Sequence, residues 1–296
     1  ELIKDLKTRA VGRVLTVLSR APVYAEPDCA HFRRCGGCSL RHVTGEEERR
    51  LKTERVRAAF SRIAGMEIPA SAARYRNKVQ YPLAAGPDGK TVFGYYARRS
   101  HAVVPHEDCR LQDPYFTALA RRAARELDRC GVRPYDEGNP RAGGCRARHL
   151  CMRKTRGGAY HLCLVVTELS ENLRRAAAAL CEVEAPLSGV SASVNRAPGN
   201  AIFGETPVHL CGELRLTDTL CGRVFEISPR AFYQVNPDAA ELLYGRAAEY
   251  AALRPGEVLL DLYCGIGTVG LCIAFVLNVL LNFFEKTLLR GLKGGR

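Results

Sequence analysis

The stretch that most constrains the fold of this chain is LLDLYCGIGTVGL, residues 259–271. An apolar run leads into Asp261, and a glycine-rich loop then opens onto a second apolar segment. Glycine allows a loop to turn sharply and a ligand to approach the backbone, because no Cβ stands in the way. The pattern is typical of a buried strand, a tight loop and a helix N-terminus, as at the ligand-binding corner of a Rossmann-like sheet.

Two kinds of ligand fit this loop. The glycines that start at Gly265 match the dinucleotide fingerprint G-x-G-x-x-G, and Glu285 lies about 20 residues on, where that fingerprint wants an acid. However, an acid and a large aromatic, Asp261 and Tyr263, stand just before the first glycine. This suits S-adenosylmethionine, which presents an ammonium and a carboxylate instead of a pyrophosphate. The loop alone favours a methyltransferase and leaves a dehydrogenase open.

Three of the thirteen cysteines, Cys29, Cys35 and Cys38, follow a C-x5-C-x2-C pattern with glycines between the last two. A closed site needs four thiolates, and the fourth candidate is Cys109, beyond a predicted hairpin. Zinc and an iron–sulfur cluster both accept four thiolates, and the loose first spacing favours iron–sulfur. Seven cysteines without ligand-like spacing are predicted to be packing residues: Cys130, Cys145, Cys151, Cys163, Cys181, Cys211 and Cys221.

The charge of the chain points to a polyanionic partner. The net charge is +13, an excess typical of proteins that bind nucleic acid or an acidic membrane surface. The longest apolar run, residues 270–284, is too short to span a bilayer, and no secretory segment opens the sequence. We therefore expect a cytoplasmic protein without a disulfide framework, and no obligate protein partner is evident.

The middle of the chain predicts an α+β domain. Segments 75–82 and 92–96 flank the turn GPDG and predict a β-hairpin, and residues 146–167 predict a second, basic one. Helices are expected over 46–63, from Pro114 (capped by Asp113) to Cys130, over 172–181 and over 238–253, with a strand in residues 1–20 and further strands up to 220.

Aromatic and basic residues alternate along the first hairpin. Such mixtures suit single-stranded RNA, because rings stack on bases and guanidinium groups contact phosphates. A solvated β face is the alternative for any one of them. The residues are Arg74, Arg76, Lys78, Tyr95, Tyr96, Arg98, Arg99 and His101.

Five ordered motifs between Lys7 and Ala274 resemble the RNA uracil-5-methyltransferases, which use S-adenosylmethionine. They are CAHFRRCGGCSLRH, YRNKVQYPL, GYYARRSHAVV with EDCRLQ, FEISPRAFYQVNPDAAELLY, and LLDLYCGIGTVGL. The resemblance is closest to the members that carry a 4Fe-4S cluster and modify large-subunit ribosomal RNA. In this context the dehydrogenase interpretation loses support.

The resemblance implies roles for particular residues. It implies that the cluster ligands are Cys29, Cys35, Cys38 and Cys109. It implies that S-adenosylmethionine contacts Gln234 and Tyr263, with Gly265 and Gly267 against its methionine end. Cys264 is not the family's nucleophile and is expected to be a small buried thiol.

The sequence departs from the family after Ala274, where the tail matches nothing. The family's nucleophilic cysteine and general base lie further on, so no catalytic residue is assigned and an inactive fragment is expected. We predict a β-barrel remnant (1–20), a cluster loop (21–45), a central RNA-binding α+β domain (46–225), and an incomplete methyltransferase domain (226–296) that holds the first βα unit of a Rossmann-like α/β fold. A non-catalytic RNA-binding module, and transfer RNA as substrate, are the alternatives.

Overall fold

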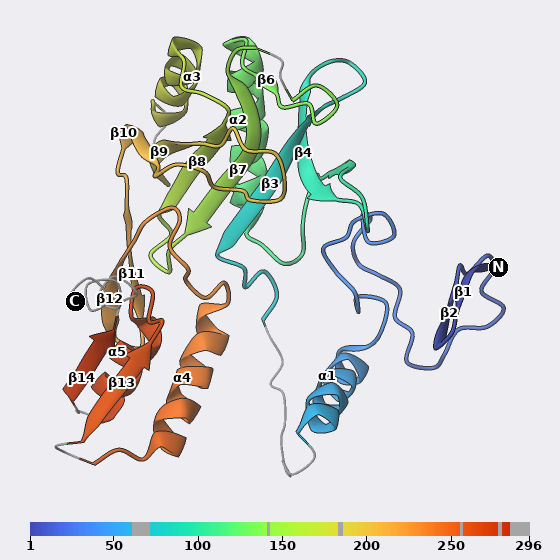
Figure 1. Cartoon of the computed structure of the whole chain (residues 1–296), viewed down its shortest axis with the longest axis vertical. Helices are drawn as coiled ribbons and strands as arrows, with labels where there is room; N and C mark the ends of the chain where they lie inside the picture. The colour runs from blue at the N-terminus through green and yellow to red at the C-terminus, as the bar shows by residue number, and fades with distance from the viewer. Residues whose placement is uncertain (61–71, 141–142, 183–185, 255–256, 278–279, 285–296) are drawn as a thin grey trace, which may run out of the picture. The chain divides into compact units, whose positions relative to one another are not determined.

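Figure 1 shows the computed structural model, which describes residues 1–60, 72–140, 143–182, 186–254, 257–277 and 280–284. The chain divides into two compact units, residues 1–33 with 38–70, and residues 34–37 with 71–296. The predicted cluster loop therefore contributes to both units. The predicted acid of the dinucleotide fingerprint, Glu285, lies outside the described residues.

The first unit holds a hairpin and one helix. Strands β1 (Leu2–Leu6) and β2 (Arg9–Gly12) pair antiparallel, so the strand predicted within residues 1–20 is a short hairpin that ends at Gly12. The chain after it is not in a strand, and Val14 and Val17 are 77% and 64% exposed. Helix α1 (Gly45–Ala59) begins as predicted, although the expected end, Ile63, lies outside the described residues.

An eight-stranded sheet dominates the described part of the second unit. Its order is β10-β9-β8-β7-β3-β4-β5, with β6 paired to β7, and only β8–β9 and β6–β7 are parallel. Both predicted hairpins are confirmed, as β3–β4 and β7–β8. The strands are β3 (Lys78–Ala85), β4 (Thr91–Tyr96), β5 (Val103–Pro105), β6 (Arg133–Pro134), β7 (Arg146–Lys154), β8 (Tyr160–Val166), β9 (Leu187–Val194) and β10 (Val208–Gly212).

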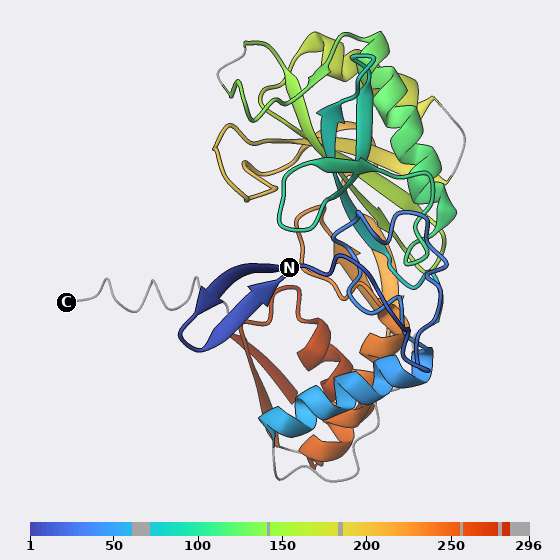
Figure 2. The ribbon, with the colours of Figure 1, turned by 90° about the vertical axis from the view of Figure 1, so that its right-hand side faces the viewer.

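Two predicted helices, α2 (Pro114–Arg129) and α3 (Glu171–Cys181), cover one face of this sheet (Figures 1 and 2). Both start at a side-chain cap, since Asp113 accepts from the Tyr115 N–H at 2.9 Å and Ser170 accepts from the Leu173 N–H at 3.1 Å. Their small and apolar side chains meet the alternate residues of β8, such as Leu162 and Leu164, in the main core.

The opposite face of the sheet is polar although it is buried. His161 of β8 and Arg153 of β7 are 3% and 4% exposed, on the side away from the main core. A two-residue period alone would place these side chains in solvent. The segment after β9 covers part of this face, where Ile202 and Phe203 pack on Cys151 and Cys163. The second hairpin is therefore basic in composition but not a solvated surface.

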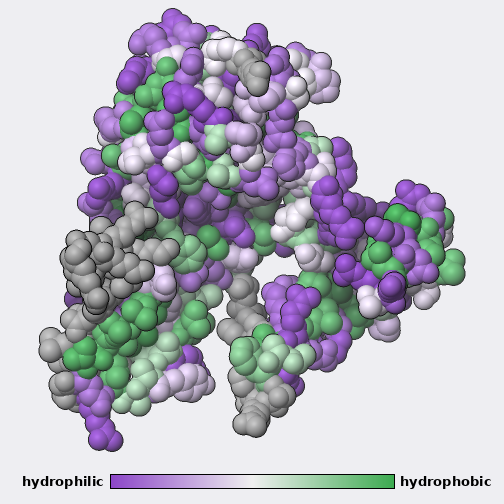
Figure 3. All heavy atoms as spheres, in the orientation of Figure 1, coloured by the Kyte–Doolittle hydropathy of each residue, from purple (hydrophilic) through white to green (hydrophobic). Residues whose placement is uncertain are grey.

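The C-terminal part begins with the hairpin β11 (Leu216–Leu220) and β12 (Arg223–Ile227) and the predicted helix α4 (Pro237–Ala251). Strand β13 (Val258–Leu262), helix α5 (Thr268–Leu277) and strand β14 (Leu280–Phe284) then form a βαβ unit with parallel strands. The expectation of a single strand and helix was thus too short by one strand. Figure 3 includes the hydrophobic surface around β13, where Val258, Leu260 and Leu262 are 51–60% exposed.

The prediction that Cys181 and Cys211 are packing residues is wrong. The structure joins them in a disulfide between the end of α3 and β10, with their Cα atoms 6.4 Å apart. Their separation of 30 residues hides this contact from spacing arguments, because the pairing of α3 with β10 brings them together. Cys130, Cys151 and Cys163 are buried, as predicted. In the described part of the chain, no helix has the length and apolar character needed to cross a membrane.

Replacing Phe116 by Ala should lower the free energy of unfolding by about 3–5 kcal/mol, because the side chain is fully buried and packs edge-on against Tyr160. Urea unfolding followed by circular dichroism measures this change. The matched control is Phe232→Ala, at a side chain that is 72% exposed, which should change stability by less than about 0.5 kcal/mol. Equal effects of the two substitutions would contradict the assigned core.

Candidate functional site

The glycine loop between β13 and α5 adopts the conformation that its composition predicts. Tyr263, Gly265 and Gly267 have positive φ angles of 61°, 59° and 76°. The Gly267 N–H donates to the Cys264 carbonyl oxygen at 2.8 Å, which closes the turn. The Asp261 carboxylate accepts from the Gly270 N–H at 3.0 Å, so it joins the end of the strand to the first turn of the helix.

This loop is open to a ligand. A Cβ added at Gly265 would meet no atom within 4 Å, and the Tyr263 side chain is 78% exposed. A left-handed conformation costs a non-glycine residue such as Tyr263 roughly 1–2 kcal/mol, and such strain concentrates at functional sites. The backbone at Gly265 and the ring of Tyr263 are thus accessible, and their predicted contact with S-adenosylmethionine stays a prediction.

Gln234 lies in a segment whose backbone is hydrogen-bonded to residues of the large sheet and its flank. The Asn77 side-chain amide donates to the Gln234 carbonyl oxygen at 3.0 Å, and the Asn77 N–H donates to the Val235 carbonyl oxygen at 2.9 Å. Arg153 donates to the Ala231 carbonyl oxygen at 2.7 Å. Because both anchors are buried, the backbone around Gln234 is tightly held.

Arg156, at the turn between β7 and β8, joins the same sheet to α4. Its guanidinium group lies 2.9 Å from carboxylate oxygens of both Asp238 and Glu241. The backbone N–H of Arg156 donates to the Asp218 carboxylate at 2.8 Å. Sequence reasoning missed Arg156, Arg153 and Asn77 as anchors. Their partners are distant in sequence. The only signal for Arg153 and Arg156 was the basic composition of the second hairpin, and that for Asn77 was its place in the motif YRNKVQYPL.

Two of the predicted cluster ligands, Cys35 and Cys109, are buried in the second unit. Cys35 forms an isolated bridge with Ala97, and the Gly36 N–H donates to the Tyr96 carbonyl oxygen at 2.9 Å. A Cβ at Gly36 would lie 2.8 Å from that oxygen, so only glycine permits the approach. Both thiols are close enough to contribute to the raised pKa of Tyr95, whose main cause is burial.

The loop that carries Cys109 is held by Arg74. The Arg74 guanidinium group makes a two-pronged ion pair with Asp108, at 3.0 and 2.9 Å, and donates to the carbonyl oxygens of Cys109 and Gln112. The hydrogen bonds that Arg74 donates to Asp108 raise the pKa of Arg74. Arg74, predicted as an RNA contact, is therefore used within the structure.

The other two predicted ligands, Cys29 and Cys38, lie in the first unit. Both are half-buried and both contribute to the raised pKa of Arg41, whose main cause is its hydrogen bonds to Asp28. Among the described residues, no group of three or more His, Cys, Asp or Glu side chains has an arrangement that would hold a metal. The metal assignment therefore stays a prediction.

The predicted RNA-binding residues of the first hairpin separate into two groups. The Tyr95 hydroxyl donates to Gln112 at 2.9 Å and its ring packs on the core, while Lys78 lies over the Phe203 ring and its pKa is lowered by burial. The structure thus does not bring all eight residues to one surface. The second group comprises Tyr96, Arg98, Arg99 and His101, which line a cavity of about 1070 Å³, and Tyr95 also contributes to that lining.

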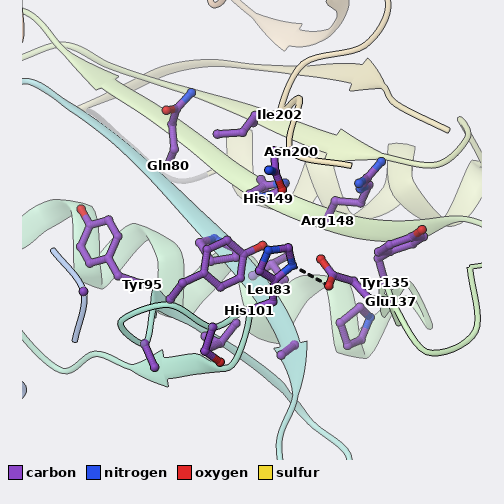
Figure 4. Close-up of a pocket in the computed structure, with 18 of the residues that line it drawn as sticks. Gln80, Leu83, Tyr95, His101, Tyr135, Glu137, Arg148, His149, Asn200 and Ile202 are labelled. Atoms are coloured by element: carbon purple, nitrogen blue, oxygen red, sulfur yellow. Dashed lines mark hydrogen bonds and ion pairs between the residues drawn. The ribbon is translucent and has the colours of Figure 1, made fainter. Parts of the chain in front are cut away.

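Figure 4 shows this cavity, which lies within the second unit. Arg148, His149 and Asn200 occupy one side, and His101 lies opposite with its ring nitrogen 2.7 Å from the Glu137 carboxylate. No sequence pattern indicated that Arg148 and His149, both on a predicted strand, would be buried beside a cavity.

Burial lowers the pKa of His149 to about 4, with a smaller contribution from Arg148. The folded protein therefore holds this ring neutral, whereas an unfolded chain protonates it near pH 6.5. The histidine's contribution to stability is complete above that pH and is lost as the pH falls toward 4. At about 1.4 kcal/mol per pKa unit, the loss reaches about 3 kcal/mol.

We expect the free energy of unfolding of the His149→Leu variant to fall less steeply between pH 6.5 and 4 than that of the wild type. The reason is that leucine takes up no proton in either state. Urea titrations at several pH values measure both slopes. Parallel slopes would mean that His149 is protonated equally easily in the folded and unfolded chain.

Comparisons with known proteins agree with the methyltransferase predicted from the glycine loop and with the nucleic-acid partner predicted from the basic composition. No family model matches the chain. It is 31% identical to an uncharacterized RNA methyltransferase of Staphylococcus aureus over 291 residues, with 93% of this chain and 62% of that protein covered. It is also 31% identical to an uncharacterized RNA methyltransferase of Clostridium tetani over 281 residues, with 91% of this chain and 60% of that protein covered.

A solved structure shares the fold. It is a Pyrococcus abyssi tRNA (uracil-54, C5)-methyltransferase in complex with S-adenosyl-L-homocysteine, with a TM-score of 0.70 and 16% identity, covering 95% of this chain and 70% of that chain. The chain spans about 60% of the length of the curated relatives it matches. Over nearly all of its own length it is thus similar to RNA methyltransferases, and it has the fold of one that methylates uracil.

Proposed function

We propose that this chain is part of an S-adenosylmethionine-dependent enzyme that methylates uracil C5 in RNA. Ribosomal RNA is the substrate that we favour. The observation that carries the proposal is its similarity, over 93% of its length, to an RNA methyltransferase. The shared fold with a uracil-5-methyltransferase that has S-adenosyl-L-homocysteine bound supports both the cofactor and the base.

The residues of the glycine loop are suited to hold the cofactor. Gly265 and Gly267 would present their backbone to its methionine end, and the exposed Tyr263 and the anchored Gln234 would contact the rest. When bound, S-adenosylmethionine supplies an electrophilic methyl group. The part played by this chain is to fix the loop, through the Asp261 bond to α5, and to fix the segment of Gln234 through Asn77.

The chemistry also needs a nucleophile. Uracil C5 reacts weakly until a thiolate adds at C6, and a base must later remove the C5 proton so that the thiolate can leave. Cys264 lies on the glycine loop and is half-buried, with its Sγ 3.8 Å from the Gly265 carbonyl oxygen. We assign it a structural role, and we propose that these 296 residues alone do not complete the reaction.

We further propose that Cys29, Cys35, Cys38 and Cys109 bind a 4Fe-4S cluster. Four cysteine thiols are the donor set that such clusters use, and the two-residue spacing keeps Cys35 and Cys38 close along the chain. Cys35 and Cys109 are both buried beside Tyr95, which supports a protected site.

Two alternatives have support of their own. Transfer RNA as the substrate is favoured by the structural neighbour, which is a tRNA methyltransferase. A non-catalytic RNA-binding module is compatible with a large basic domain beside a short methyltransferase segment.

The assay for the enzyme is transfer of a labelled methyl group from S-adenosylmethionine to unmodified ribosomal RNA and, in parallel, to unmodified transfer RNA. We expect the 296-residue chain to give no turnover, because no nucleophile is assigned within it. A longer protein that includes this chain should methylate ribosomal RNA, and Gln234→Ala in that protein should weaken cofactor binding. Turnover by the 296-residue chain that Cys264→Ser abolishes would identify Cys264 as the nucleophile.

Anaerobically purified protein should be brown and contain iron, because four thiolates of this kind suit an iron–sulfur cluster. Absorption spectra and metal analysis measure this. Cys35→Ser should remove the colour, whereas Cys163→Ser, at a buried thiol of the sheet, should retain it. A colourless protein with one zinc ion per chain would contradict the cluster.

A further inference from the structure

The cavity between β4, β7 and the segment after β9 has a lining that the proposed cofactor site does not explain. None of the residues proposed to hold S-adenosylmethionine lines it. Its volume of about 1070 Å³ is slightly larger than the roughly 300–1,000 Å³ of small-ligand pockets. It is therefore a separate site with room for a nucleotide.

A buried positive charge stands at this cavity. Arg148 is 5% exposed, and its guanidinium group donates only to the carbonyl oxygens of Asn195 and Ala197, at 3.0 and 2.7 Å. Within the described part of the chain it has no acidic partner, and its Nε has no hydrogen-bond acceptor. Burial of a charge that lacks an ion-pair partner is costly, so a ligand that contacts this guanidinium group would stabilise the arrangement.

One cation–π pair and one pair of stacked rings lie at the cavity. The Arg148 guanidinium lies over the Tyr135 ring at 4.5 Å, and the Tyr96 and His101 rings stack with centroids 5.2 Å apart and planes at 24°. Nucleobases stack on both kinds of surface. These stacking surfaces favour a ligand that contains a base, because a simple anion would need only a positive charge for binding.

The polar groups at the cavity also match a base. Gln80 and Asn200 carry amides that both donate and accept, and Glu137 offers a carboxylate. His149 is 8% exposed and its Nδ1 has no partner within the described residues. A carboxylate next to the bound ligand would repel a bare phosphate but accepts hydrogen bonds from base amino groups. The exposed Arg98 and Arg99 at the rim are suited to the phosphates on either side.

We propose that this cavity binds one unpaired nucleotide of the RNA, distinct from the uridine that receives the methyl group. The base stacks against the Tyr135–Arg148 pair, and the adjoining phosphates contact the rim arginines. This inference rests on the proposed function for the identity of the polymer. It makes the central sheet a second recognition site, which selects RNA with an unpaired base at a fixed distance from the methylated one.

The test is binding of a short, fluorescein-labelled single-stranded RNA that carries one 2-aminopurine, without S-adenosylmethionine. Binding to the wild type should quench 2-aminopurine, because the base stacks on an aromatic ring. Tyr135→Ala should weaken binding about fivefold or more and abolish the quenching, since one base–aromatic stack is lost. The matched controls, Arg121→Ala and Arg125→Ala on α2, do not line the cavity and should keep the quenching.

Arg148→Lys retains the charge but loses the planar stack, so it should also lose the quenching. If the Arg148→Lys variant does not fold, the Tyr135→Ala variant still tests the site, because Tyr135 is only half-buried. Wild-type affinity and quenching in Tyr135→Ala would overturn the proposal, as would displacement of the RNA by polyglutamate as readily as by unlabelled RNA. A protein that binds this RNA through the cavity but never accepts methyl groups onto RNA would overturn the proposed function alone.

Discussion

The buried polar face of the large sheet is the constraint on which the rest of the second unit depends. Strands β7 and β8 place apolar side chains against α2 and α3, and basic and imidazole side chains on the other face. Burial lowers the pKa of Lys78. It also lowers the pKa values of His149 and His161 to about 4 and that of Arg153 to about 10. Arg153 donates to the Ala231 carbonyl oxygen and lies near the Tyr233 ring, and Lys78 lies over the Phe203 ring.

This face of the sheet connects the proposed cofactor site with the proposed nucleotide site. Arg153 and Asn77 hold the backbone of the Gln234 segment, and Arg156 holds α4, which leads to the glycine loop. Farther along β7, Arg148 and His149 line the cavity that we assign to an unpaired nucleotide. One strand thus supports both the segment proposed to contact the cofactor and the site proposed to contact RNA, so their separation is fixed by the sheet.

Cysteine has several roles in this chain, and sequence spacing distinguishes only some of them. The C-x5-C-x2-C pattern singles out Cys29, Cys35 and Cys38 as candidate ligands, because nearby thiolates can reach a common centre. The disulfide of Cys181 with Cys211 has no such signal. It depends on α3 and β10 packing together, which is a property of the tertiary structure.

The sequence by itself determined the elements whose signals are local. The cap at Asp113, the GPDG hairpin and the glycine loop formed where predicted, because capping, turns and positive φ depend on a few neighbouring residues. Only the tertiary structure decided which basic residues line a cavity and which are bonded within the protein. Arg74 and Lys78 are used internally while Arg148 is buried at a cavity, because burial depends on partners that are distant in sequence.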